Sequence, residues 1–153
     1  MINFSEKSIK GKSTELQCAA AFAELGFNVL LPFGGQERYD IVVDTGEKFL
    51  RIQCKSASLY SGGNRIRFDT RSTNHKNSTK ESRHYTKDEI DYFATAYDGK
   101  CYVVPVEEVD GMSAVSIYLK KTKYTPNQNP KMGSDYEIRN VFKPLSFEKN
   151  EIS

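Results

Sequence analysis

Residues 39–55 read YDIVVDTGEKFLRIQCK, and this stretch decides the fold. Its two halves, Tyr39–Asp44 and Lys48–Lys55, are rich in the β-branched, aromatic and aliphatic residues typical of strands. Thr45–Glu47 lies between them and carries the glycine of a tight turn. The stretch therefore predicts an antiparallel hairpin at the centre of a sheet.

Polar residues sit inside the second strand of this hairpin. Because successive side chains of a strand point to opposite faces, Gln53 and Lys55 share one face, and Ile52 and Cys54 share the other. Pairing through the short turn places Asp40 level with these residues, to within one or two positions of register. A carboxylate, an amide and an ammonium group are then expected to meet at one end of the sheet.

Each of these polar residues, taken alone, has a structural explanation. An Asp at a strand start commonly accepts turn hydrogen bonds, and a Lys at a strand end commonly extends its ammonium into solvent. Gln53 fits an edge amide with satisfied hydrogen bonds. The combination of the three, next to a basic segment, favours a functional site.

Two helices are predicted from capping boxes. Thr14 followed by Gln17 indicates a helix through about Leu25, and its first turn carries Glu15. Thr86 followed by Glu89 indicates a second helix, over residues 88–97, with Ile90, Phe93, Ala94 and Tyr97 on one face.

The remaining segments are assigned by alternation and by turn residues. Short apolar or alternating runs predict strands at residues 27–31, 65–69, 101–106 and 114–119. Polar runs without periodicity predict surface loops at residues 70–84 and 120–134. The order of elements predicts a mixed α+β fold, in which helices flank a central mixed sheet.

The charge of the chain is concentrated in one segment. The formal net charge is only +2, but residues 51–87 hold nine Lys and Arg against two acidic residues. This segment also contains both histidines, His75 and His84. Arginines interleaved with Ser, Thr and Asn are suited to phosphate and base contacts, so the segment favours nucleic-acid binding over a merely solvated loop.

Composition limits the class of protein. With 153 residues, 38% hydrophobic and 27% charged, the chain is expected to form one globular domain. No apolar run approaches the roughly 20 residues needed to cross a bilayer, so a cytoplasmic location is expected. The three cysteines, Cys18, Cys54 and Cys101, lie far apart in apolar patterns and are expected to be reduced structural thiols.

The ordered set of a helix with Glu15, a strand with Asp40, a hairpin and Gln53-Cys54-Lys55 resembles the PD-(D/E)XK nuclease core. Gly11-Lys12-x-x-Glu15 and Leu25–Val29 are similar to its opening helix and first strand. The run from about Lys10 to Leu119, including the segment 88–97 and residues 102–109, resembles more narrowly the small homing endonucleases of this class that are encoded in group I introns.

This resemblance implies a restriction-endonuclease-like domain over residues 1–153. Its core spans about 10–119, a basic DNA-binding loop of about 60–87 is inserted in the core, and 120–153 form a C-terminal extension.

The resemblance also implies roles for the site residues. Asp40 is expected to ligate a catalytic Mg²⁺, for which Mn²⁺ would substitute, and Glu15 to support the metal or its waters. The backbone carbonyl of Cys54 is a further implied ligand. Lys55 is expected to orient the attacking water and to stabilise charge on the phosphate.

Gln53 departs from the family pattern, which usually has Asp or Glu at this position. An amide still offers an oxygen to a metal ion, but it binds more weakly than a carboxylate. Two interpretations follow: Gln53 is a functional substitute in an active enzyme, or the site has lost catalysis and kept DNA binding. Retention of Asp40, Lys55 and Glu15 favours the active enzyme, because unpaired, partly buried charges are costly to keep.

The expected function is therefore a site-specific, Mg²⁺-dependent endonuclease that cuts double-stranded DNA. The alternatives are a structure-specific nuclease such as a Holliday junction resolvase, and a noncatalytic DNA-binding module. Cutting both strands predicts a homo-oligomer, either a dimer or a tetramer, on a partly palindromic target. The residues expected to contact DNA are Arg65, Arg67, Arg71, His75, Lys76, Lys80, Arg83, His84, Lys120, Lys121 and Lys123.

Overall fold

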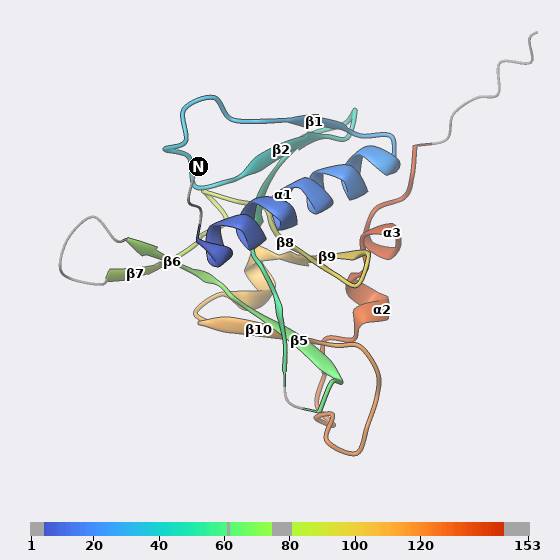
Figure 1. Cartoon of the computed structure of the whole chain (residues 1–153). Helices are drawn as coiled ribbons and strands as arrows, with labels where there is room; N and C mark the ends of the chain where they lie inside the picture. Colours follow the sequence, from blue (N-terminus) through green and yellow to red (C-terminus); the bar gives the residue numbers. More distant parts are fainter. Residues whose placement is uncertain (1–4, 61, 75–80, 146–153) are drawn as a thin grey trace, which may run out of the picture.

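A five-stranded sheet forms the centre of the computed structural model, which describes residues 5–60, 62–74 and 81–145 (Figure 1). The strands lie in the order β1-β2-β3-β8-β9. β3 and β8 are parallel and the other neighbours are antiparallel, so the sheet is mixed, as the sequence predicts. The strands are β1 (Asn28–Leu30), β2 (Ile41–Asp44), β3 (Phe49–Cys54), β8 (Tyr92–Tyr97) and β9 (Lys100–Pro105).

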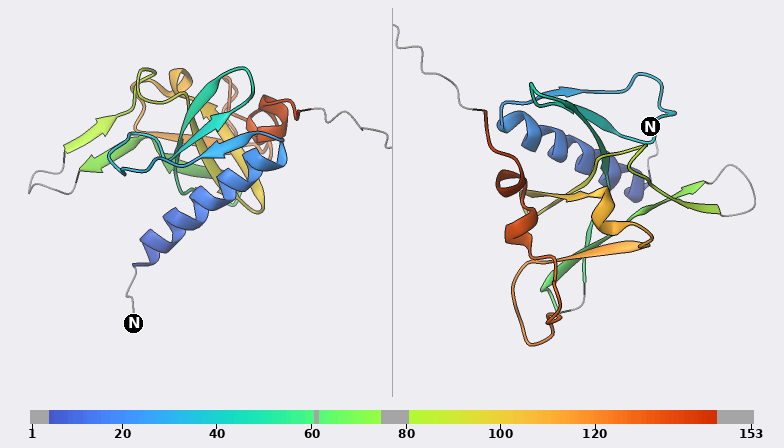
Figure 2. Two further views of the ribbon diagram at one scale, coloured as in Figure 1. Left: turned by 90° about the horizontal axis from the view of Figure 1, so that it is seen from above. Right: turned by 180° about the vertical axis from the view of Figure 1, so that it is seen from behind.

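Helix α1 (Glu6–Glu24) crosses one face of this sheet (Figures 1 and 2). It begins at the N-cap Ser5, whose hydroxyl accepts from the backbone N–H of Ser8. The predicted start at Thr14 is wrong: Thr14 is buried within the helix and its hydroxyl donates to the carbonyl of Lys10 at 2.9 Å. The first turns of α1 are polar and show no apolar periodicity. The sequence therefore predicts only the later part of the helix, which packs against the core.

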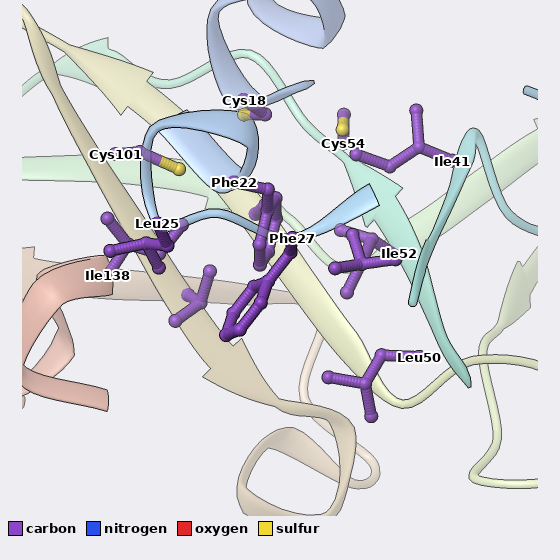
Figure 3. Packing of buried hydrophobic residues seen from close by; sticks show 13 residues of the cluster. Cys18, Phe22, Leu25, Phe27, Ile41, Leu50, Ile52, Cys54, Cys101 and Ile138 are labelled. Carbon is purple, nitrogen blue, oxygen red and sulfur yellow. The ribbon is translucent and has the colours of Figure 1, made fainter. Parts of the chain in front are cut away.

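The first core lies between α1 and the central sheet (Figure 3). Phe22 and Leu25 from the helix pack there with Ile41, Val43 and Ile52 from the hairpin strands. The three cysteines are free thiols buried in the same cluster, which confirms their expected structural character.

A second core lies on the opposite face of the sheet, under a three-stranded sheet in the order β10-β5-β4. Alternate residues of β8 and β9 serve the two cores: Ala94 and Val103 face the first, while Phe93 and Val104 face the second. Strands β8 and β9 are thus covered on both faces. The strands of the second sheet are β4 (Ser58–Leu59), β5 (Arg65–Asp69) and β10 (Ala114–Tyr118).

The predicted helix over residues 88–97 is wrong, because most of this segment is strand β8. The capping pair does form one turn: the N–H of Thr86 donates to the Glu89 carboxylate, and the N–H of Ile90 donates to the carbonyl of Thr86. The chain then leaves the turn, and the N–H of Asp91 donates to the carbonyl of Arg51 at the start of the β3–β8 pairing. A strand buried on both faces lacks alternation, and its apolar positions imitate a helical face.

The predicted surface loop over residues 70–84 is also wrong for the described part of that segment. β6 (Arg71–Asn74) and β7 (Glu81–His84) pair as an antiparallel hairpin that projects from the body of the molecule (Figures 1 and 2). Residues 120–132 carry no helix or strand, as expected, apart from an isolated bridge at Met132. The remaining elements are the 3-10 helix η1 (Val106–Val109) and the short helices α2 (Gly133–Tyr136) and α3 (Ile138–Val141).

Among the residues that the structure describes, no helix is both long and apolar enough to cross a membrane.

Two leucines near α1 provide a test of this core. Leu25, at the C-cap of the helix, is 1% exposed, whereas Leu16 is 70% exposed. Leu25→Ala is expected to lower the free energy of unfolding by about 2–5 kcal/mol, because it leaves a cavity in the first core. Leu16→Ala, the control, should change it by less than about 0.5 kcal/mol. Urea denaturation of both variants measures the difference, and equal losses would contradict this packing.

Candidate active site

The pairing of β2 with β3 places Asp40 beside the end of β3. Ile41 lies opposite Ile52, and the backbone N–H of Asp40 donates to the carbonyl of Ile52 at 2.9 Å. The Asp40 carboxylate in turn accepts from the backbone N–H of Cys54 at 2.8 Å. The sequence-based register for Asp40 is therefore confirmed, and the carboxylate is held at the position where Gln53 and Lys55 follow one another.

Lys55 is half-buried next to this carboxylate. Its ammonium group donates to the main-chain carbonyl of Arg71 at 2.9 Å and to the hydroxyl of Tyr85 at 3.4 Å. Burial lowers the pKa of Lys55, while the negative charge of Asp40 acts in the opposite direction. The ammonium group is thus held between the Asp40 carboxylate and the hairpin formed by β6 and β7.

Helix α1 brings Glu15 to the same place. Glu15, Cys54, Lys55, Asp69 and Arg71 line one pocket of about 320 Å³, together with Lys7, Lys10, Gly11 and Ser56. The helix is fixed there by two contacts: the ammonium group of Lys10 donates to the Ala57 carbonyl at 2.8 Å, and the hydroxyls of Thr14 and Ser56 lie 3.0 Å apart.

Both carboxylates in this site are partly buried. Burial raises the pKa of Glu15, and the nearby charge of Asp40 raises it further. Burial also raises the pKa of Asp40, against the opposing effects of the Cys54 N–H and the Lys55 ammonium. Two partly buried carboxylates, one of which raises the pKa of the other, form a site that a cation would stabilise.

The donor set at this end of β3 fits Mg²⁺. The carboxylates of Glu15 and Asp40, the carbonyl of Cys54 and the amide of Gln53 are all oxygen donors, which this ion prefers, and it needs only one or two carboxylates. Within the described ranges, no cluster of three or more His, Cys, Asp or Glu side chains has the geometry of a metal site. A metal here would therefore depend on the backbone and amide oxygens as well.

The Gln53 amide turns its nitrogen, and not its oxygen, toward the neighbouring backbone carbonyl. Its amide nitrogen donates to the carbonyl of Cys54 at 3.3 Å. If both oxygens are to reach one metal ion, the amide must turn so that its oxygen replaces its nitrogen beside this carbonyl.

The residues expected to contact DNA fall into two groups. Arg71, Arg83 and His84 belong to the projecting hairpin. Arg65, Lys120 and Lys123 line a second pocket of about 610 Å³ at one end of the β10-β5-β4 sheet. Arg67 and Lys121 are exposed near this pocket, whereas His75, Lys76 and Lys80 lie outside the described residues.

Aromatic side chains accompany the second group. The guanidinium of Arg65 lies 4.4 Å from the ring centroid of Tyr60 and donates to the hydroxyl of Tyr118 at 3.2 Å. Tyr124, which is 78% exposed, lines the same pocket. Cationic groups interleaved with aromatic rings are suited to nucleic acid, since they offer both charge and stacking surfaces.

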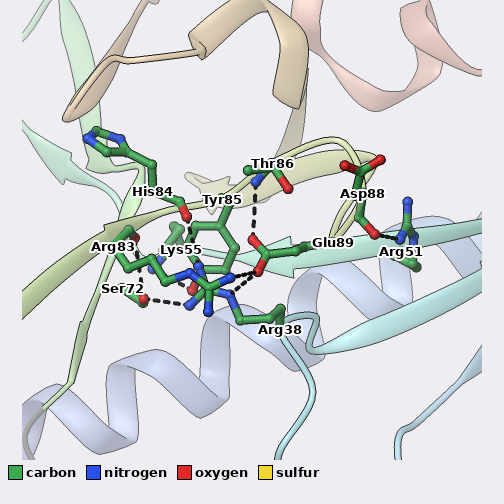
Figure 4. A network of polar contacts seen from close by, with 10 residues as sticks. All are labelled: Arg38, Arg51, Lys55, Ser72, Arg83, His84, Tyr85, Thr86, Asp88 and Glu89. Carbon is green, nitrogen blue, oxygen red and sulfur yellow. Dashed lines mark hydrogen bonds and ion pairs between the residues drawn. The ribbon is translucent and has the colours of Figure 1, made fainter.

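Several residues near the site are not predicted from the sequence. The guanidinium of Arg38 and the ammonium group of Lys55 both lie over the ring of Tyr85, and Figure 4 shows the three residues together. Lys7 and Lys10 were missed because the helix was expected to begin only at Thr14. The position of Arg38 directly before Tyr39-Asp40 is the one feature that draws attention to it.

A family model described as PD-(D/E)XK endonuclease matches residues 5–138. The chain belongs to this family. The solved structure of a bacterial homing endonuclease, I-Ssp6803I, is similar to it, with a TM-score of 0.69 and 23% sequence identity over 87% of this chain and 89% of that one. At this identity the likeness shows the fold, which is therefore that of a PD-(D/E)XK homing endonuclease. No curated protein matches the sequence.

The buried carboxylate of Asp40 generates a prediction about stability and pH. A raised pKa means that the folded state holds the proton more tightly than the unfolded chain, so stability is lost as the pH rises through the folded pKa. Asp40→Asn stays neutral and can still accept from the Cys54 N–H. It is expected to be more stable than the wild type at neutral pH by about 1 kcal/mol. The difference should vanish below the ordinary carboxyl pKa of 3.8.

Chemical denaturation of the metal-free protein across this pH range measures the effect. Asp44→Asn is the matched control, because Asp44 lies at the other end of β2 from Asp40 and accepts a turn hydrogen bond from Gly46 at 2.8 Å. A loss of stability in Asp40→Asn at neutral pH would mean that Lys55 and Cys54 outweigh the cost of burial.

Proposed function

We propose that this member of the PD-(D/E)XK endonuclease family is a site-specific endonuclease of homing type that cuts both strands of duplex DNA with Mg²⁺. One observation carries the proposal: Glu15, Asp40 and Lys55 converge at the end of β3, directly beside a projecting basic hairpin. Family membership supports the nuclease chemistry, and the homing-endonuclease fold of the solved structure supports the narrower assignment.

Phosphodiester hydrolysis defines what the site must do. Negative charge develops on the nonbridging oxygens and on the leaving alkoxide, and a water molecule must be aligned opposite the leaving group. When bound, Mg²⁺ would supply a water of lowered pKa and neutralise charge on the phosphate; Mn²⁺ would substitute. Asp40 and the Cys54 carbonyl would hold the ion, with Glu15 and the turned amide of Gln53 completing the oxygen donors or binding its waters.

Lys55 has a separate role in the proposal. Among the residues that the structure describes, no carboxylate lies within salt-bridge distance of its ammonium group, which is near Asp40 and donates to two neutral acceptors. The positive charge is therefore left available to a scissile phosphate and to the attacking water. The lowered pKa of Lys55, caused by burial, reflects the desolvated position in which such a charge acts most strongly.

Gln53 fits an active site with a weakened metal ligand. Its amide is already at the Cys54 carbonyl, and a rotation about its last side-chain bond exchanges nitrogen for oxygen. A neutral ligand in place of a carboxylate lowers the affinity for the metal and leaves the rest of the donor set in place. This supports tuned activity over lost activity.

DNA recognition in the proposal uses both basic groups. The hairpin with Arg71 and Arg83 would enter a groove, where Arg side chains contact guanine edges and phosphates. The pocket with Arg65, Lys120 and Lys123 would extend the contact along the backbone. Cleavage of both strands requires one site for each strand, so the active form is proposed to be a homo-oligomer, a dimer or tetramer, on a partly palindromic target.

The first test removes the ammonium group. Lys55→Ala is expected to lower single-turnover cleavage by about 100- to 1,000-fold, as the loss of one group that stabilises transition-state charge typically does. DNA affinity measured in Ca²⁺ should remain within a few-fold. Lys48→Ala, on the exposed turn at the other end of β3, is the control and should cleave at the wild-type rate. Full activity in Lys55→Ala would exclude this site, and a wild-type protein that binds DNA without cutting it would favour the noncatalytic DNA-binding module.

The second test addresses the substrate. Incubation with Mg²⁺ and a randomised duplex library is expected to enrich one long cleaved sequence with partial twofold symmetry. A four-way junction of unrelated sequence should be cut much more slowly. Preferential cleavage of the junction would replace the homing assignment with a structure-specific nuclease.

A further inference from the structure

Both hydrogen-bond acceptors of the Lys55 ammonium group come from the projecting hairpin. The carbonyl of Arg71 belongs to the first residue of β6, and Tyr85 directly follows the last residue of β7. The ammonium group also lies 4.9 Å from the centroid of the Tyr85 ring. The projecting hairpin and the residue that follows it therefore supply the hydrogen-bond acceptors that orient the Lys55 side chain.

Arg38 joins the hairpin to the core at the same place (Figure 4). Its guanidinium donates to the hydroxyl of Ser72 on β6 at 2.6 Å and to the carbonyl of His84 on β7 at 3.0 Å. It stacks on the Tyr85 ring at 3.9 Å. One planar fork thus contacts both strands of the hairpin and the aromatic ring that holds Lys55.

Glu89 completes the attachment from the turn before β8. Its carboxylate forms an ion pair with Arg38 at 3.3 Å and another with Arg83 of β7. It also accepts from the N–H of Thr86 at 3.2 Å. The Glu89 side chain is only 15% exposed and the Arg38 side chain 24%, so their ion pair is shielded from water, whereas the Arg83 side chain is 68% exposed.

We propose that Tyr85 and Arg38 are positioning residues for Lys55, and that duplex DNA seated on the β6–β7 hairpin aligns the ammonium group for cleavage through them. This inference rests on the proposed nuclease function. Tyr85 is 8% exposed, which leaves it little surface for DNA, so its effect must pass through Lys55. A lysine side chain has four rotatable carbon–carbon bonds, and the Tyr85 hydroxyl, the Tyr85 ring and the Arg71 carbonyl restrict them together.

The consequence for substrate choice is direct. A duplex that fits the hairpin keeps the Arg71 carbonyl and the Tyr85 hydroxyl within hydrogen-bond distance of Lys55. The ammonium group of Lys55 then points to the scissile phosphate. A duplex that binds elsewhere on the basic surface leaves the hairpin unsupported. Discrimination between target and other DNA is therefore expected in the cleavage rate as well as in binding.

Tyr85→Phe tests the hydroxyl while it keeps the ring. It is expected to lower kcat by about tenfold with KM and DNA affinity in Ca²⁺ unchanged, because a small misplacement of a reacting group costs rate and not binding. Tyr92→Phe is the matched control: Tyr92 lies on β8 with its ring 5.2 Å from that of Phe142, and it should cleave as the wild type does. Wild-type kcat in Tyr85→Phe would overturn the proposal.

Arg38→Lys separates geometry from charge. The substitution keeps a positive charge near the DNA but cannot reproduce contacts to Ser72, His84 and Glu89 at once. It is expected to lower kcat to a similar extent as Tyr85→Phe, and the double variant should lose little more than either single one, because both act through Lys55. Retained kcat in Arg38→Lys, or multiplied losses in the double variant, would show that Arg38 does not act through Lys55.

Thermal unfolding of each variant separates misplacement from misfolding, and Ser72→Ala provides a milder change that removes one acceptor of Arg38. Ser72→Ala is expected to lower kcat by a few-fold, and an unchanged kcat would contradict the positioning role of Arg38.

These outcomes are distinguishable from failure of the proposed function. If Lys55→Ala is inactive while Tyr85→Phe and Arg38→Lys cleave normally, the nuclease assignment stands and the positioning inference falls. If the wild type cuts no DNA, both fall.

Discussion

Ile41 pairs with Ile52 across β2 and β3, and this register serves the core and the candidate site at the same time. It turns Ile41, Val43, Leu50, Ile52 and Cys54 toward helix α1, and it brings the Asp40 carboxylate to the Cys54 N–H. A shift by one residue would expose the apolar set and separate the carboxylate from Lys55. The hydrophobic requirement of the sheet therefore holds the polar site in place, because neither can move without the other.

The candidate site holds several ionisable side chains in partly buried positions, where their charged forms are disfavoured. Burial raises the pKa of Glu15 and Asp40 and lowers that of Lys55, so each group is held where its charged form is less stable than in water. Such an arrangement reduces stability, and the surrounding packing must offset it. A bound cation would stabilise the buried carboxylates of this pocket, and a bound phosphate would stabilise the buried ammonium group. This is the property expected of a phosphodiester-cleaving centre.

The sequence was sufficient for elements with alternation or tight turns. The β2–β3 hairpin, β5 and β10 each carry one buried and one accessible face, so alternation in the sequence predicts them. The predicted hairpin in turn places Asp40, Gln53 and Lys55 at one end of the sheet. Strand β8 is covered by a core on each face, which removes alternation and left only a local capping signal that closes a single turn. The β6–β7 hairpin is rich in Ser, Thr, Asn and Arg, and its pairing is stabilised by contacts from Arg38 that lie far away in the chain. The sequence does not predict the roles of Tyr85 and Arg38 for the same reason: their contacts join segments that are far apart in the chain.

The parallel pairing of β3 with β8 is expected to form later in folding than the β2–β3 hairpin. Ile52 pairs with Tyr92, which is 40 positions further along the chain, whereas β2 and β3 meet through a short turn. Local contacts form early and distant ones late, since closing a long loop costs entropy before its contacts form. We therefore expect Asp40 and Lys55 to be neighbours in water before β8, Tyr85 and the β6–β7 hairpin enclose them. If their charges are desolvated only late in folding, the cost of burying them is expected to speed unfolding without slowing the formation of the β2–β3 hairpin.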